Sequence, residues 1–289
     1  MKVKSIFFIT LLCLVSCTRF FSLDGFLFEP TKVDEYLKPE DLEEWGVRFI
    51  IPDSLIEPVV LISMGNKIYG FFVIGNPDST VKNQVTILYC HGKDENINRE
   101  WHKVEYFWEM GYNVFIFDYQ GYGKSEGEPS GPALFSDGTQ SLSYLQSRAD
   151  IDTSKIVIYG WSIGSFVATY LAAEVHHPAA LILESAPASI TALLHDSALI
   201  NLPGSYVADA DFDNEARISN IHSSLFMLHG KEDDFVVFER HAPLIWDKAR
   251  EPKENLWVEN AGHDDIPQVL GNSYHQAITS FILRYILNP

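Results

Sequence analysis

Hydrophobic and polar positions alternate along the chain between short apolar runs and longer segments with helical spacing. The apolar runs are typical of buried strands, and two β-rich runs joined by a turn at Gly65 precede them. The predicted strands span 57–63, 67–74, 84–90, 113–118, 155–159, 180–183, 225–228 and 255–258. The predicted helices span 98–110, 135–148, 162–176 and 274–287. Continuous apolar strands separated by helices predict an α/β fold with a mostly parallel central sheet flanked by helices.

The alternation stops between Ser185 and Ser223, where no strand is predicted. We interpret about 186–222 as a small cap inserted into one α/β domain that spans 46–289, after a leader at 17–45. The cap is apolar first and acidic later: Ile190, Leu193, Leu194, Leu199, Ile200 and Leu202, then Asp209, Asp211, Asp213 and Glu215. The apolar half would either line an acyl pocket or pack the cap on the sheet, and the acidic half would disfavour anionic substrates.

Residues 1–16 predict a lipoprotein signal peptide. Two lysines precede the uncharged run Ser5–Ser16, which is too short to span a bilayer. The run ends in Leu14–Cys17, which resembles a bacterial lipobox and implies that Cys17 is lipidated and anchors the protein to a membrane. Thr18 after the cysteine favours the outer membrane, so we expect an extracytoplasmic protein of the bacterial cell envelope. An ordinary signal peptide is the alternative.

The composition and charge limit the classes of partner that the protein can bind. The 289 residues are 46% hydrophobic, as in an ordinary globular protein. Their net charge of -18 argues against a nucleic-acid partner. Three cysteines are too few for a disulfide framework, and signal cleavage with lipidation would leave Cys90 alone.

A candidate nucleophile lies at one strand end. Gly160-Trp161-Ser162-Ile163-Gly164 follows a predicted strand and opens a predicted helix, which is the context that a G-x-S-x-G nucleophile requires. A Cβ at either glycine would clash in so sharp a turn. A tight turn with a capping serine is the structural alternative.

If the chain has the α/β-hydrolase fold, the acid and then the base follow Ser162 in the chain. Of ten histidines, His263 directly follows the last strand, whereas His91 and His229 suit buried structural roles. Asp233 lies three residues after Gly230 at the preceding strand end, and Asp234 and Glu184 compete with it. The acid would orient the imidazole of His263.

An oxyanion hole needs two backbone N–H groups. Ile163, just after the nucleophile, would supply one, and Lys93 in the loop after Cys90 would supply the other. The structural alternative is a tight strand-to-helix turn with no oxyanion hole, which would show the same sequence pattern.

These motifs resemble the α/β-hydrolase-domain-containing 17 type and its bacterial relatives. The matching segments are His91–Gly92, Asp118–Ser125, Tyr159–Gly164, His229–Asp233 and Ala261–Ile266. The resemblance implies an α/β-hydrolase fold and a Ser-His-Asp triad without metal or organic cofactor. Eukaryotic members of that family include thioester-cleaving protein depalmitoylases. The chain departs from the pattern at Lys93-Asp94, where the family more often has Asn and a small residue.

We therefore predict a lipid-anchored serine hydrolase that cleaves a small acyl ester or thioester through an acyl-enzyme. Two alternatives stay open: a serine peptidase of the prolyl-oligopeptidase kind, and a non-catalytic binding lipoprotein with the same fold. The absence of a large extra domain argues against the first alternative, and the intact triad argues against the second.

Overall fold

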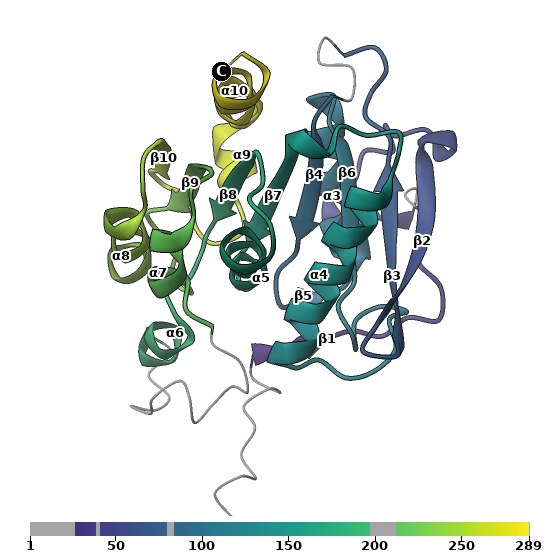
Figure 1. Ribbon diagram of the computed structural model, residues 1–289, viewed down its shortest axis with the longest axis horizontal. Coiled ribbons are helices and arrows are strands. Elements are labelled where there is room, and N and C mark those ends of the chain that lie inside the picture. Colours follow the sequence, from purple (N-terminus) through teal and green to yellow (C-terminus); the bar gives the residue numbers. More distant parts are fainter. Residues whose placement is uncertain (1–26, 39–40, 80–83, 197–211, 289) are drawn as a thin grey trace, which may run out of the picture.

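The computed structural model describes residues 27–38, 41–79, 84–196 and 212–288 (Figure 1). The predicted nucleophile, base, acid and oxyanion residues all lie in these ranges. Cys17 with the signal peptide lies outside them, and so does the middle of the cap at 197–211.

One eight-stranded sheet organises the fold, in the order β10-β9-β8-β7-β4-β6-β3-β2. Its strands are β2 (Ile56–Ser63), β3 (Asn66–Val73), β4 (Thr86–Cys90), β6 (Asn113–Phe117), β7 (Ile156–Trp161), β8 (Ala180–Glu184), β9 (Ser224–Gly230) and β10 (Lys253–Val258). The six strands β4 and β6–β10 pair in parallel, whereas β3 is antiparallel to both of its neighbours. All parallel carboxyl ends therefore meet at one edge, where ligands bind in open α/β sheets.

The predicted hairpin joins β2 to β3. Met64 and Gly65 both have positive φ, 50° and 87°, which is the backbone that a tight two-residue hairpin turn requires. The predicted strand ends are correct to within a few residues throughout the sheet.

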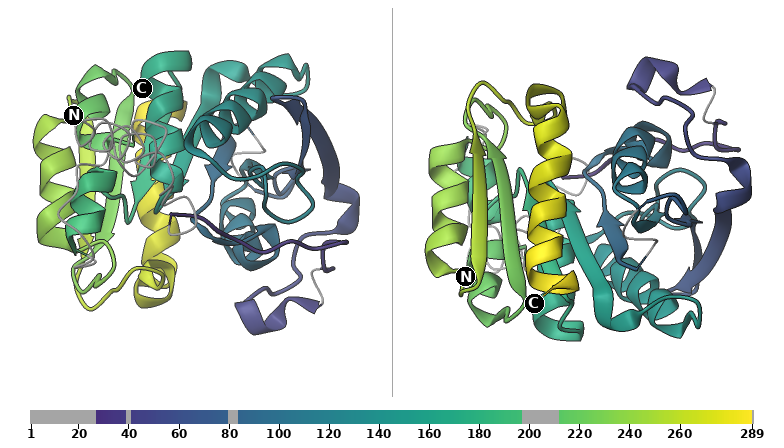
Figure 2. Two further views of the ribbon diagram at one scale, coloured as in Figure 1. Left: turned by 90° about the horizontal axis from the view of Figure 1, so that it is seen from below. Right: turned by 90° about the horizontal axis from the view of Figure 1, so that it is seen from above.

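Helices cover both faces of the sheet. They are α3 (Ile97–Glu109), α4 (Gly131–Ser147), α5 (Gly164–Tyr170), α6 (Ile190–Asp196), α7 (Asn214–Arg217), α8 (Phe238–Lys248), α9 (Ile266–Leu270) and α10 (Asn272–Ile282). Helices α3 and α10 lie on the opposite side of the sheet from α4 and α5 (Figure 2). Alternate residues of one strand accordingly enter different cores: Leu88 packs with α4 and α5, and Tyr89 packs with α3 and α10.

The helices differ from the sequence predictions in two ways: α4 begins earlier than predicted, and α6, α7, α8 and α9 were not predicted. Helix α4 begins four residues early, at Gly131, because the Ser130 side chain caps it by accepting the Ala133 N–H and a proline occupies its first turn. Helix α8 was not predicted, since Pro243 interrupts its pattern. Its buried face of His241, Ala242 and Ile245 packs on the domain nevertheless.

The leader contributes to the body of the protein. Leu27 and Phe28 are buried, and the Phe28 ring meets Phe212 edge-on at 6.3 Å. Glu29–Pro30 forms β1, which pairs in parallel with β5 (Asp94–Glu95) near the carboxyl ends of the sheet (Figure 1). Within the described ranges, no helix has the length and apolar character needed to cross a bilayer.

Candidate active site

Ser162 occupies a strained turn between β7 and α5. Its φ is 52°, in the left-handed region, and its backbone N–H donates to the Glu184 carbonyl at 3.0 Å. A Cβ on Gly160 would lie 2.7 Å from Ala168 Cβ, and one on Gly164 only 2.1 Å from the Cys90 carbonyl oxygen. The tight packing explains both glycines of the motif and holds the Ser162 hydroxyl at the carboxyl edge of the sheet.

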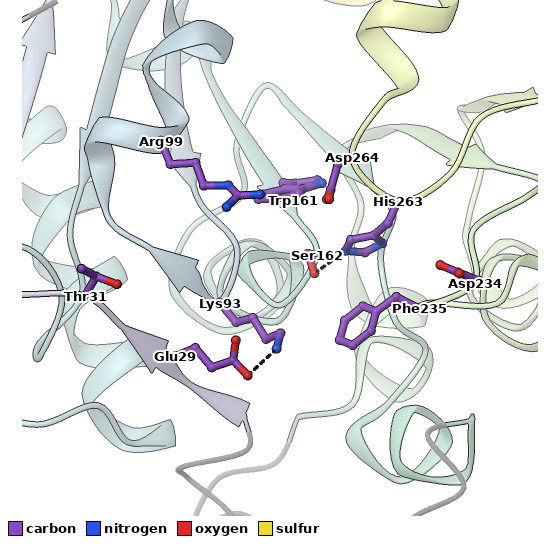
Figure 3. A pocket seen from close by; sticks show the side chains of 10 residues that line it. All are labelled: Glu29, Thr31, Lys93, Arg99, Trp161, Ser162, Asp234, Phe235, His263 and Asp264. Carbon is purple, nitrogen blue, oxygen red and sulfur yellow. Dashed lines mark hydrogen bonds and ion pairs between the residues drawn. The ribbon is translucent and has the colours of Figure 1, made fainter. Parts of the chain in front are cut away.

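His263 joins Ser162 to Asp233. Its Nε2 lies 2.9 Å from Ser162 Oγ, and its Nδ1 lies 2.8 Å from Asp233 Oδ2. His263 follows β10 and Asp233 follows β9, so the three residues come from three strand ends (Figure 3). Asp233 accepts the Nδ1 proton, which leaves Nε2 free to accept the proton of the Ser162 hydroxyl.

The Asp233 carboxylate is held by its own loop. Its Oδ1 accepts the backbone N–H groups of Phe235, at 3.0 Å, and Val236, at 2.7 Å. The buried His229 supports the other oxygen: its Nε2 lies 3.4 Å from Asp233 Oδ2 and 2.7 Å from the Val236 carbonyl oxygen. Burial alone would raise the pKa of Asp233, but hydrogen bonds from His229 and His263 hold that pKa well below its usual range. Asp233 is therefore ionised at neutral pH.

The competing acids make other contacts. Buried Glu184 pairs with Lys103 Nζ at 3.1 Å and accepts the Tyr274 hydroxyl at 2.9 Å. Lys103 Nζ in turn lies 3.7 Å from the centre of the Trp161 ring, so this ion pair packs against the residue that precedes Ser162. Asp234 lines the pocket beside Phe235.

The two predicted oxyanion residues flank the nucleophile. Ile163 directly follows Ser162 at the start of α5. Lys93 lies in the loop after β4, where a Cβ on Gly92 would come within 2.6 Å of the Trp161 ring. This close approach brings the loop against the nucleophile turn. The Lys93 side chain leans over the Phe235 ring and pairs with Glu29 at 3.0 Å.

A pocket of about 520 Å³ opens over Ser162. Its lining mixes charges of both signs with two aromatic rings: Glu29, Thr31, Lys93, Arg99, Trp161, Ser162, Asp234, Phe235, His263 and Asp264 (Figure 3). A second cavity of about 380 Å³ shares Arg99, Trp161 and Asp264 with it. Trp161, the residue before Ser162, therefore lines both cavities.

The described part of the cap packs on the core of the domain and does not line this pocket. Ile190, Leu193 and Leu194 are buried in the core that contains Phe166. Asp213 caps α7 by accepting the Ala216 N–H, and Glu215 pairs with Lys248 at 2.7 Å. None of these five residues is among the pocket lining. The packing alternative therefore holds for Ile190, Leu193 and Leu194. Leu199, Ile200, Leu202, Asp209 and Asp211 lie outside the described ranges.

Sequence reasoning missed several residues of the site. It left the leader unplaced, although Glu29 and Thr31 line the pocket, and it assigned no role to Arg99. It placed His229 as a buried imidazole without its contact to Asp233. The short apolar stretch at Leu27–Phe28 was the available signal that the leader packs on the body.

Comparisons with known proteins identify the family and the fold. A family model described as "Serine aminopeptidase, S33" matches residues 81–202. The chain is 32% identical over 230 residues to alpha/beta hydrolase domain-containing protein 17B of Xenopus tropicalis, covering 78% of this chain and 74% of that protein. The chain belongs to the α/β-hydrolase family. This α/β-hydrolase is also 29% identical over 230 residues to "Uncharacterized protein YfhR" of Escherichia coli K12, covering 78% of this chain and 79% of that protein.

The fold of this α/β-hydrolase matches solved structures. The Pyrococcus furiosus esterase Pf2001 superposes with a TM-score of 0.69 at 19% identity, covering 90% of this chain and 98% of the esterase. The predicted fold class and the resemblance to the 17 type are thereby confirmed, and the family makes the protein a hydrolase. The lipoprotein signal stays a prediction.

Proposed function

We propose that this α/β-hydrolase is a serine hydrolase that cleaves a small acyl ester or thioester through an acyl-enzyme. One observation carries the proposal: Ser162 Oγ, His263 and Asp233 form a continuous hydrogen-bonded chain, with links of 2.9 and 2.8 Å, at the floor of an open pocket. This order of groups makes a weak hydroxyl nucleophile reactive.

In the proposed reaction, His263 Nε2 takes the proton of Ser162 as Oγ attacks the acyl carbon. The carbonyl π electrons move to oxygen, and the N–H groups of Ile163 and Lys93 bind the resulting oxyanion. The tetrahedral intermediate collapses, the leaving alcohol or thiol takes the proton from His263, and the acyl-enzyme remains. Water, deprotonated by His263, then attacks the acyl carbon of the acyl-enzyme. The second tetrahedral intermediate collapses with cleavage of the bond to Ser162 Oγ, which takes the proton back from His263, and the carboxylic acid is released.

The substrate class follows from the site and from the relatives. The pocket of about 520 Å³ falls in the size range of small-molecule sites, and the second cavity beside Trp161 leaves room for a leaving group. The structural relative Pf2001 is named an esterase, which favours ester chemistry, whereas the family model carries the name of a peptidase. An amide substrate is therefore included as an arm of the test.

We further place this hydrolase at the bacterial cell envelope, anchored through lipid on Cys17 and facing away from the cytoplasm. The support is the sequence: two lysines, the short apolar run and the Leu14–Cys17 pattern.

The test of the reaction compares wild type with Ser162→Ala, His263→Ala and the double variant. A fluorophosphonate probe should label wild type and the exposed control Ser143→Ala equally, and should not label Ser162→Ala. Hydrolysis of a p-nitrophenyl ester should fall by about 10⁴-fold or more in either single variant, and little further in the double variant, because triad members act as a unit. A matched thioester and anilide rank the bond types.

Persistent ester hydrolysis in Ser162→Ala would overturn the mechanism. An anilide that reacts faster than the ester would instead identify a peptidase.

A further inference from the structure

The loop that carries Lys93 has three consecutive carbonyl groups with hydrogen-bond donors: the first and third receive donors from other segments, and the second receives one from the ring of His91 in the same loop. The Tyr119 hydroxyl donates to the His91 carbonyl at 3.1 Å. The His91 ring nitrogen Nδ1 lies 2.9 Å from the Gly92 carbonyl oxygen. The Lys93 carbonyl receives two donors, the Tyr122 hydroxyl at 2.8 Å and the Glu29 backbone N–H at 3.2 Å.

These anchors fix the peptides on both sides of the Lys93 Cα. Burial lowers the pKa of His91 to about 4, so its ring is neutral and Nδ1 carries the proton that the Gly92 carbonyl accepts. In a trans peptide the C=O and the next N–H point in opposite directions, so holding the Gly92 carbonyl aims the Lys93 N–H. Holding the Lys93 carbonyl then fixes the remaining dihedral angle of that residue.

One of these anchors comes from the N-terminal segment, which is also held by contacts on either side of Glu29. Buried Leu27 and Phe28 lie on one side of Glu29. On the other side, the Thr31 carbonyl accepts the Gly123 N–H at 3.0 Å and the Asn96 side-chain amide at 3.1 Å. Strand β1 is thus held at both ends while its Glu29 N–H reaches Lys93.

The side chains of Glu29 and Lys93 also contact each other, at the edge of the pocket. Figure 3 shows Glu29 and Lys93 joined across the rim that faces Ser162 and His263. The Glu29 side chain is 57% exposed and the Lys93 side chain 17% exposed, so their ion pair contributes little energy. The backbone contact, not this ion pair, is the part of β1 that can hold the loop.

We propose that strand β1 is a positioning element of the reaction, in which the Glu29 N–H together with the Tyr122 hydroxyl holds Lys93 with its N–H aimed at the oxyanion. The inference rests on the proposed function, since it takes Lys93 as an oxyanion donor. Preorganised donors are effective because they need no reorientation as the charge develops. Loss of either anchor should therefore lower the rate of the chemical step rather than the binding of the ester.

The test separates the backbone contact from the ion pair. Glu29→Pro removes both the N–H and the carboxylate, whereas Glu29→Gln removes only the negative charge. Residue 29 already precedes Pro30, so its backbone is in the extended range that proline accepts. Tyr122→Phe removes the second donor. Glu35→Gln, which breaks the exposed pair with Lys124 in the same segment, and Tyr144→Phe on α4 are the matched controls.

Deletion of a whole oxyanion donor lowers kcat by about 10²–10³-fold, and loss of one of two anchors should cost less. We expect kcat for a p-nitrophenyl ester to fall about tenfold in Glu29→Pro and in Tyr122→Phe, and about a hundredfold in the double variant, with KM within about twofold. Both controls should keep the wild-type kcat, and Glu29→Gln, which keeps the backbone N–H, should lose clearly less kcat than Glu29→Pro. The Ki of a trifluoromethyl ketone, whose adduct with Ser162 places an oxyanion in the hole, should rise in step with the loss of kcat/KM.

Thermal melts and circular dichroism check that each variant is folded. If Glu29→Pro does not fold, Tyr122→Phe alone tests whether anchoring of Lys93 contributes to the rate. Unchanged kcat and unchanged ketone affinity in folded variants would overturn the inference, as would equal losses in Glu29→Gln and Glu29→Pro. Either result, obtained while Ser162→Ala is inactive, refutes the role of β1 and leaves the serine mechanism standing. Activity that survives in Ser162→Ala refutes the proposed function itself.

Discussion

At the scale of single residues, Asp233 differs from the neighbouring acids in what its oxygens contact. One oxygen accepts two backbone N–H groups of its own loop, and the other lies 2.8 Å from His263 Nδ1. Glu184 is occupied by Lys103 and Tyr274. Asp233 therefore has both the fixed position and the contact with the imidazole that the acid of a triad needs.

This difference predicts unequal effects of the same substitution. Asp233→Asn should lower kcat by about 10³–10⁴-fold, because an amide in that place favours the wrong tautomer of His263. Asp234→Asn should lower kcat by less than about tenfold, since Asp234 lines the pocket without an Asp233-like contact to the ring. Steady-state kinetics on one activated ester compares the two. A larger loss of kcat in Asp234→Asn than in Asp233→Asn would identify Asp234 as the acid of the triad.

The residues that sequence could predict are those whose chemistry is tied to a strand end. Ser162, Asp233 and His263 each follow an apolar run, and their order in the chain limits the choice. The contact of His229 with Asp233 and that of Tyr122 with Lys93 join residues whose spacing carries no signal. Such contacts exist only once the chain has folded.

At the scale of elements, the central strands β4, β6, β7 and β8 were predictable because burial on both faces leaves an uninterrupted apolar run. Helix α8 was not, because its proline breaks the helical pattern while tertiary packing of Ile245 and its neighbours still forms the helix. The connection between elements around Asp118 was also hidden. That carboxylate, just after β6, accepts the Ile97 N–H at the start of α3 and the Tyr36 hydroxyl of the leader.

This junction predicts a pH dependence of stability. Burial raises the pKa of Asp118 to about 7, with hydrogen bonds from Tyr36 and Ile97 acting against the rise and Glu100 adding to it. The neutral ring of His91 lies 3.5 Å from the same carboxylate. An unfolded Asp has a pKa of about 3.9, so between about pH 4 and pH 7 the folded protein binds more protons than the unfolded chain.

The contribution of Asp118 to stability is therefore full below about pH 4 and is lost as pH rises toward about 7. Urea unfolding across this range should show a fall of up to about 4 kcal/mol in wild type relative to the curve of Asp118→Asn, which cannot titrate. Exposed Asp41→Asn is the control and should follow the wild-type slope. Parallel curves for wild type and Asp118→Asn would show that this carboxylate keeps the same pKa in both states.

At the scale of the whole molecule, the parallel sheet gathers the ends of β4, β7, β9 and β10 at one edge, which is why ordered motifs in the sequence could predict a single site. The position of the leader could not be predicted in this way. It depends on the pairing of β1 with β5 and on the contact of Phe28 with Phe212, a cap residue. Its placement has a consequence for the proposed anchor. Leu27, the first described residue, comes ten residues after Cys17, and ten extended residues span at most about 35 Å.

A lipid on Cys17 would accordingly hold the pocket within a few tens of ångströms of the bilayer, and the local concentration of lipid-borne esters would rise. We expect wild type and Cys13→Ala to partition into the detergent phase, and Cys17→Ala to stay in the aqueous phase. For an ester embedded in vesicles, kcat/KM should be about tenfold higher in wild type than in Cys17→Ala. For a soluble p-nitrophenyl ester the two should be equal, because no described pocket residue changes. Equal partition of wild type and Cys17→Ala into water would disprove the anchor, whereas detergent partition without the vesicle preference would show that the anchor does not bring the pocket to its substrate.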